Sequence, residues 1–236
     1  MFKLEPFCGC EKIKSSGKTI GKLKDFWGWS YSALYTPITR GFFAEYIVFK
    51  AIDDDKDDGF RPPLNYLSTK MEKDEPDLIT YFGDDKMTIQ VKSIDNLKKE
   101  LAFTFDKTHG YNASTDLNDL EKGHHSYLFV FCFLELDKEK HDEIDRLRKT
   151  WNETNFENQT DEEVEKYRLF QDYLNESVLD MSNWTFYLCR SNVVANQESI
   201  RVSKLNKLAE KNTVVKCSYS QLHASLKVFH VLKVSE

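Results

Sequence analysis

Long hydrophobic runs are missing from this sequence of 236 residues. No apolar stretch approaches the roughly 18 residues that a helix needs to cross a bilayer. Residues 1–6 also lack the apolar stretch of a secretory signal peptide. The chain is nevertheless 40% hydrophobic and 14% aromatic, which is enough for a buried core and excludes disorder as its main state. We therefore expect a soluble, cytoplasmic protein with no membrane association.

Cysteine is scarce, with five residues in all. An odd number does not suit a disulfide framework. Three of the cysteines, Cys132, Cys189 and Cys217, lie in apolar, strand-like segments, where we expect each thiol to pack as a small hydrophobic group. Cys8 and Cys10 form a close pair, but no second pair occurs at the spacing of a zinc site. The sequence therefore disfavours zinc.

Glycine-rich phosphate loops are absent as well. Neither the Gly-x-x-x-x-Gly-Lys-Ser/Thr loop nor the Gly-x-Gly-x-x-Gly turn occurs, which argues against nucleotide hydrolysis and dinucleotide redox chemistry. The Gly-x-Ser-x-Gly motif of α/β-hydrolases is also missing. We expect no nucleotide cofactor.

Neither sign of charge dominates. The chain has 33 Lys and Arg against 39 Asp and Glu, a formal net charge of −6, which excludes a protein that coats nucleic acid by bulk charge. The charge is unevenly spread: +4 over residues 1–40, −8 over 41–136, −7 over 137–182 and +5 over 183–236. An acidic middle between basic ends suits a cation site beside a phosphate-binding surface, although solvated helix faces and loops explain the same pattern.

The chain has no internal repeat, low-complexity tract or Pro/Gly/Ser linker, so we expect one domain over residues 1–236. Residues 1–40 form an N-terminal extension and residues 137–182 a helical insertion. Residues 41–52 are apolar almost all round, which predicts a buried helix, with Glu45 as its one carboxylate. The acidic run that begins at Asp53 ends this helix.

Two nearly continuous apolar runs, residues 127–136 and 184–189, predict strands that are covered on both faces. Between them, Thr160 and Glu163 form a capping-box signature. An apolar seam follows at helical spacing; it either packs on its own domain or serves as a dimer or target-recognition surface. The predicted fold class is α/β, with a mixed central sheet flanked by helices.

The most informative segment is a predicted hairpin of residues 77–82 and 87–94, joined by a turn at residues 83–86. If Phe82 lies opposite Met87, then Asp77 pairs with Lys92. The alternation places Asp77, Gln90 and Lys92 on one polar face. The opposite face is apolar and consists of Leu78, Phe82, Met87, Ile89 and Val91.

Polar groups on otherwise apolar strands require a reason, because burying an unpaired charge is costly. A divalent cation is one: the Asp77 carboxylate, the Gln90 amide oxygen and the Val91 backbone carbonyl are oxygen ligands of the kind that Mg²⁺ prefers. Lys92 could orient or deprotonate an attacking water or offset charge on a phosphate, and Glu45 could reach the cation directly or through water. The alternative is an ordinary cross-strand ion pair between Asp77 and Lys92, with Gln90 filling space.

The order of these features resembles the PD-(D/E)xK phosphodiesterase superfamily, and especially its Mrr-like variants with Gln in place of the acidic residue. The resemblance spans roughly residues 41–189 and depends on Glu45, Pro76-Asp77 and Gln90-Val91-Lys92. It implies a restriction endonuclease-like three-layer fold, metal ligation by Glu45, Asp77 and Gln90, and a Lys92 that assists the attacking water.

The resemblance also implies hydrolysis of double-stranded DNA with Mg²⁺, or Mn²⁺ in its place, by a homodimer in restriction-type host defence. A neutral Gln90 binds a cation more weakly than a carboxylate does. This leaves open a catalytically degenerate protein that binds nucleic acid or a protein partner without cleavage. Candidate DNA contacts are Lys98, Lys99, Lys107 and Asn112, each of which could instead be a solvated loop residue.

Overall fold

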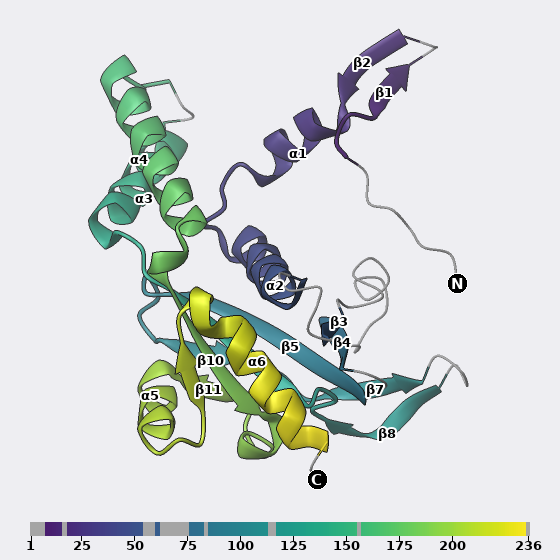
Figure 1. Ribbon diagram of the computed structural model, residues 1–236. Helices are drawn as coiled ribbons and strands as arrows, with labels where there is room; N and C mark the ends of the chain where they lie inside the picture. Colours follow the sequence, from purple (N-terminus) through teal and green to yellow (C-terminus); the bar gives the residue numbers. More distant parts are fainter. Residues whose placement is uncertain are drawn as a thin grey trace.

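The computed structural model describes residues 8–15, 18–53, 60–61, 76–82, 85–112, 117–154 and 157–234. Its main feature is a six-stranded sheet with the strand order β12-β10-β9-β5-β4-β3 (Figure 1). The β5–β9 pair is parallel and the other pairs are antiparallel, so the sheet is mixed and the α/β prediction is confirmed. The strands are β3 (Phe60–Arg61), β4 (Leu78–Phe82), β5 (Asp85–Asp95), β9 (Leu128–Leu134), β10 (Trp184–Arg190) and β12 (Val215–Cys217).

The two long apolar runs of the sequence form neighbouring strands inside the sheet. All seven residues of β9 are buried, because β9 has a strand on each side and is covered on both faces. In β10 only Thr185 and Arg190 are partly exposed. The prediction of central strands here is confirmed.

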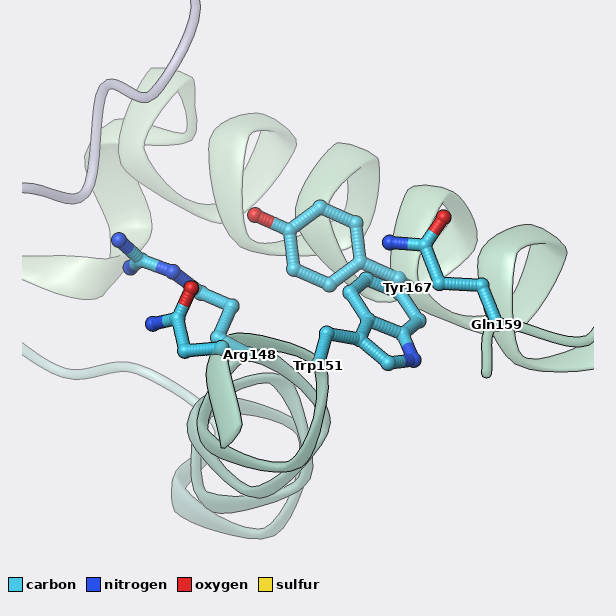
Figure 2. Close-up of a pocket in the computed structure, with 5 residues that line it drawn as sticks. Arg148, Trp151, Gln159 and Tyr167 are labelled. Atoms are coloured by element: carbon cyan, nitrogen blue, oxygen red, sulfur yellow. The ribbon is translucent and has the colours of Figure 1, made fainter. Parts of the chain in front are cut away.

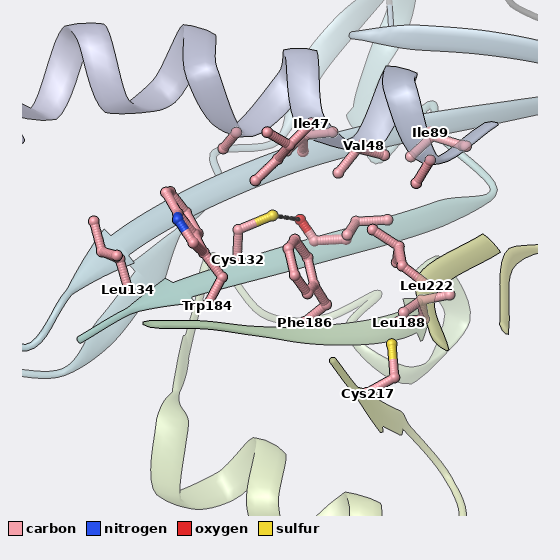
Figure 3. Close-up of a cluster of buried hydrophobic side chains, with 14 of the residues drawn as sticks. Ile47, Val48, Ile89, Cys132, Leu134, Trp184, Phe186, Leu188, Cys217 and Leu222 are labelled. Carbon is pink, nitrogen blue, oxygen red and sulfur yellow. Dashed lines mark hydrogen bonds between the residues drawn. The ribbon is translucent and has the colours of Figure 1, made fainter. Parts of the chain in front are cut away.

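Helices and a small sheet cover the two faces of the central sheet. On one face lie α2 (Pro37–Asp53) and α6 (Tyr219–Val234), and Figure 3 shows side chains of both helices directed at strand residues such as Cys132 and Phe186. On the other face lie α5 (Val202–Glu210) and the β6–β11 pair (Ala102–Thr104 and Ser199–Arg201). The sheet is thus the middle of three layers.

The helix α2 carries Glu45 and lies along β5. It begins at Pro37, whose fixed φ suits the first position of a helix. Its inner side is buried through Ala44 and Val48, but Phe42 and Tyr46 are 42% and 45% exposed. The prediction of a helix buried all round was therefore wrong in part, because α2 packs on a single face of the sheet and its outer side faces solvent.

Between β9 and β10 the chain forms an antiparallel pair of helices, α3 (Lys138–Glu153) and α4 (Asp161–Leu179), followed by η1 (Met181–Asn183). These helices occupy the predicted insertion 137–182. The capping box of Thr160 and Glu163 is confirmed, since each side chain accepts the other's backbone N–H. The seam of α4 packs within the chain: Leu174 and Val178 are fully buried in the core on the α2 side.

The extension before residue 40 contains a two-stranded hairpin, β1 (Lys12–Ser15) and β2 (Lys18–Lys22), followed by α1 (Leu23–Tyr31). Figure 1 shows this part projecting from the layered body. A second hairpin, β7 (Thr108–Asn112) and β8 (Leu117–Gly123), follows β6, and η2 (Ser191–Val193) follows β10.

The thiols of Cys132, Cys189 and Cys217 are buried, as predicted, and burial raises the pKa of each. Cys8 and Cys10 are exposed. Among the helices that the structure describes, none combines the length and the apolar character needed to cross a membrane.

Candidate functional site

The β4–β5 hairpin has a different register from the predicted one. We predicted Phe82 opposite Met87, whereas Phe82 pairs with Asp85. The link between the strands is two residues long and not four, because Asp85 and Lys86 already belong to β5. The register is therefore shifted by two residues.

A shift of two keeps the described side chains on their predicted faces, because strand side chains alternate with a period of two. The side chain of Phe82 lies outside the described part of the chain. Leu78 and Ile89 are register partners, and both are buried on the α2 side. The shift does change the partner of Asp77. One step beyond the Leu78–Ile89 pair, Asp77 comes opposite Gln90 and not opposite Lys92 as predicted.

The carboxylate of Asp77 joins the side chain of Gln90 to the backbone of β5. Its Oδ2 atom accepts hydrogen bonds from Gln90 Nε2 at 2.6 Å and from the Val91 N–H at 2.7 Å. Asp77 is half-buried, as is Gln90. Asp77 thus ends the β4–β5 ladder, and its side chain takes the place of a strand carbonyl.

The backbone carbonyl of Val91 faces the same edge. In an antiparallel ladder the N–H and C=O of one residue point to the same neighbouring strand. Because the Val91 N–H is bonded to Asp77, the Val91 C=O points to the side of β5 on which Asp77 lies. A carboxylate, an amide and a carbonyl therefore converge where β4 begins.

Lys92 is half-buried and lies on the same face of β5 as Gln90, two residues further on. The parallel neighbours of these residues on β9 are Phe129 for Gln90 and Phe131 for Lys92. Both rings belong to the core on the α5 side of the sheet. Gln90 and Lys92 therefore stand beside an aromatic wall on the β9 flank, and Asp77 adjoins Gln90 on the β4 flank.

Glu45 lies on α2, which packs on the opposite face, the one formed by Ile89 and Val91. It is half-buried, and its charge contributes to the raised pKa of Cys132, after the larger effects of burial and Cys217. The structure thus brings Asp77, Gln90 and Val91 together and aligns Lys92 with them. The role of Glu45 as a cation ligand stays a prediction.

The candidate DNA contacts lie in three different segments of the chain. Lys98 and Lys99 are exposed in the turn after β5, and Lys107 is half-buried between β6 and β7. Asn112 is the last residue of β7, and its side chain lies outside the described part of the chain. Their roles stay predictions.

A buried ion pair was not foreseen from the sequence. Arg40 of α2 donates from Nη1 to Asp95, the last residue of β5, and to the carbonyl of Tyr35 at 3.2 Å. Arg40 is 1% exposed and Asp95 5%. The pair fixes the start of α2 to the end of the strand that carries Gln90 and Lys92. Arg40 and Asp95 both follow segments that mix polar and apolar residues, and nothing in their spacing signals the pairing.

Helices of the insertion help to form two hollows among the described residues. One, of about 250 Å³, is formed by α3 and α4 around Trp151, Tyr167, Arg148, Asn152 and Gln159 (Figure 2). The other, of about 270 Å³, lies between the start of α2, the end of β5 and α3, next to Asp95 and His141. Neither hollow has a signal in the sequence.

The oxygen groups at the β4–β5 edge suit a hard cation. Mg²⁺ is commonly bound by one or two carboxylates, with waters and substrate phosphates completing an octahedral shell. In the described ranges, no three residues of His, Cys, Asp and Glu are grouped to hold a metal. Asp77, with the Val91 carbonyl and a rotated Gln90 amide, fits such a one-carboxylate site.

Comparison of the chain with protein-family models, curated proteins and solved structures finds no match.

Proposed function

We propose that this chain is a Mg²⁺-dependent endonuclease that hydrolyses phosphodiester bonds of double-stranded DNA, with Mn²⁺ able to replace Mg²⁺. The observation that carries the proposal is the meeting of the Asp77 carboxylate with the Gln90 side chain and the Val91 backbone. The order of α2, β4 and β5, with β9 and β10 following, supports a restriction endonuclease-like fold.

Asp77, Gln90 and Val91 are the residues that would hold the cation. Gln90 now donates its Nε2 to Asp77; a half-turn about its terminal torsion, which is broad and two-fold, would present its oxygen. When bound, Mg²⁺ acts as a Lewis acid toward a phosphate oxygen and lowers the pKa of a bound water.

Hydrolysis joins a water oxygen to phosphorus and breaks the bond between phosphorus and one sugar oxygen, which takes up a proton. Negative charge grows on the phosphoryl and leaving oxygens in the transition state. Lys92 lies about 7 Å along the strand from Gln90, on the same face. There its ammonium group stabilises this charge, and Asp77 and Gln90 would hold the cation at the start of β4.

Cleavage of both DNA strands requires two active centres. A homodimer with two equivalent sites supplies them most simply and matches the two-fold symmetry of a duplex site. We therefore infer a homodimer that acts in restriction-type host defence.

The test is cleavage of supercoiled plasmid by the full chain with Mg²⁺ or Mn²⁺, against an EDTA control. Asp77→Asn keeps an oxygen that can accept the Val91 N–H but removes the charge, and we expect it to lower cleavage at least 100-fold. We expect Lys92→Gln to lower it 100-fold as well, by loss of electrostatic stabilisation.

Lys86→Gln is the matched control, because it removes the same charge from the same face of β5 at the turn end of the hairpin. Its cleavage rate should stay within threefold of the wild type. Circular dichroism and urea unfolding of each variant establish that the fold is intact. Full activity of folded Asp77→Asn or Lys92→Gln would rule out the proposed site.

A second candidate function is that of a catalytically degenerate protein that binds nucleic acid without cutting it. One observation favours it: Asp77 accepts two short hydrogen bonds, which give its carboxylate a structural role at the end of the β4–β5 ladder. Such a protein binds duplex DNA equally well in EDTA and in Mg²⁺ and gives no product on any plasmid.

A further inference from the structure

The N-terminal hairpin concentrates positive charge in an acidic protein. Residues 12–24 contain five lysines and no acidic residue, in a chain with a formal net charge of −6. Every one of these lysines is exposed: Lys12, Lys14, Lys18, Lys22 and Lys24. The hairpin contributes nothing to either of the two buried clusters of the described residues. Its charge therefore has no role in packing the layered body.

The register of the hairpin gathers three of the lysines on one face. Lys12 lies directly opposite Lys22, and Lys14 lies opposite Thr19. The register shifts between Ile13 and Lys14, and the extra residue lies on β2. Because β1 keeps its alternation, Lys12 and Lys14 leave the same face, which Lys22 shares as the partner of Lys12. We call Lys12, Lys14 and Lys22 the lysine face.

Like charges directly opposite each other destabilise a strand pair. The Lys12–Lys22 pair therefore costs stability in the free protein, and a bound anion between the two ammonium groups would relieve that cost. The two nearby carboxylates are both engaged by backbone groups at the base of the hairpin. Glu11 accepts the Cys8 N–H at 2.9 Å, and Asp25 accepts the Lys22 N–H at 2.8 Å.

The shape of the hairpin also suits an extended polyanion. Figure 1 shows β1 and β2 projecting away from the central sheet. A two-stranded ribbon is one of the elements that the major groove of duplex DNA admits, with phosphates along both rims. Lysines from such a ribbon position a protein on DNA through phosphate contacts that are independent of sequence.

We propose that the lysine face binds the phosphate backbone of double-stranded DNA. This deepens the proposed function and rests on it for the choice of duplex DNA as the polyanion. The hairpin holds the substrate, whereas the β4–β5 edge cuts it.

The size of the effect follows from counterion release. Each phosphate neutralised by a lysine contributes about 0.9 to the slope of log Kobs against log salt concentration. Three contacts contribute about 2.7 to the slope, so a rise from 50 to 200 mM salt lowers their contribution to the binding constant about 40-fold. Loss of the lysine face should remove this share.

The experiment measures fluorescence anisotropy of a labelled 30-base-pair duplex with the full chain in EDTA, over 50–200 mM NaCl. The test variant is K12Q/K14Q/K22Q. The matched control is K138Q/K207Q/K211Q, which removes the same charge from exposed positions on α3 and at the end of α5. Urea unfolding of both variants checks that they are folded.

We expect the salt slope to fall by about 2.7 in the test variant and to stay unchanged in the control. An unchanged slope in the test variant, an equal fall in both variants, or no duplex binding by the wild type would overturn the proposal. So would a wild type that binds phosphatidylserine vesicles but not DNA.

The two proposals fail separately. Duplex binding that depends on the lysine face, with no cleavage in Mg²⁺, supports the proposed role of the hairpin and refutes the proposed nuclease activity. Cleavage by the wild type, with unchanged binding in the test variant, refutes only the proposal that the lysine face binds DNA.

Discussion

Removing one partner of the Arg40–Asp95 ion pair is expected to destabilise the fold by about 3–5 kcal/mol. Arg40 and Asp95 are 1% and 5% exposed, so neither charge has water to replace a lost partner. Burial already lowers the pKa of Arg40, against the opposing effect of Asp95. The free energy of unfolding of natural domains is only about 5–15 kcal/mol, so a loss of this size is a large fraction of the total stability.

Urea denaturation of Arg40→Met, Asp95→Leu and the double variant measures this effect. Each single variant leaves a charge buried alone, whereas the double variant replaces both charges with apolar groups. We expect the double variant to lie within about 2 kcal/mol of the wild type, because apolar replacement of a buried pair is often neutral. The coupling between the two substitutions should therefore be several kcal/mol.

The exposed pair of Arg201 and Glu100 is the matched control. Its atoms lie 2.7 Å apart, but the side chains are 68% and 74% exposed. Arg201→Gln should cost less than about 1 kcal/mol. If Arg40→Met costs no more than Arg201→Gln, the Arg40–Asp95 pair is not a buried tie between α2 and β5.

Two further expectations concern thiols and pH. In the native protein a thiol reagent at pH 8 should modify two of the five cysteines, the exposed pair near the N-terminus. Burial suppresses thiolate formation by the other three and raises the pKa of Cys189 to about 12. All five should react in urea, and reaction of more than two in the native protein would contradict the burial of these thiols in the core. Hydrogen bonds from Arg146, and to a smaller extent from Lys166, lower the pKa of Glu143 to about 2, so the ionised Glu143 stabilises the fold at pH values above its usual pKa of 4.5. Glu143→Gln should therefore cost up to about 1 kcal/mol of unfolding free energy at pH 7. In urea denaturation, the difference between wild type and variant should vanish as the pH falls from 4.5 to 2, whereas a constant difference would contradict this pairing.

The fold elements that the sequence predicted are those with strong periodic or continuous apolar patterns. The central strands β9 and β10 were predicted because nearly continuous apolar runs suit burial on both faces. The capping box at Thr160 was predicted because its two hydrogen bonds are local. In each case the signal depends on residues close together in the chain.

Features that local sequence patterns do not determine were missed or misplaced. The turn of the β4–β5 hairpin was expected to take the four residues 83–86, because the link Gly-Asp-Asp-Lys is turn-forming, yet Asp85 and Lys86 extend β5. Arg40 and Asp95 are 55 residues apart, so no local pattern links them. The outer side of α2 was expected to be buried, because apolar composition alone does not show how many faces a partner covers.

The part of the candidate site that follows from the alternation of side chains along β5 was predictable from the sequence. The common face of Gln90 and Lys92 follows from their spacing alone. The partner of Asp77 depended on the register, and the correct register strengthens the cluster by bringing Asp77 to Gln90 and Val91. The position of Glu45 relative to this cluster depends on how α2 is placed over the sheet, which the sequence does not specify.

The central claim is that Asp77, Gln90 and Val91 form a divalent cation site. It is tested most directly by the anomalous difference density of Mn²⁺ in crystals of the full chain. We expect a peak about 2–2.3 Å from an Asp77 carboxylate oxygen and from the Val91 carbonyl oxygen, lost in crystals of Asp77→Asn. A Mn²⁺ peak elsewhere only, or the same peak in Asp77→Asn, would contradict the site and the nuclease proposed from it.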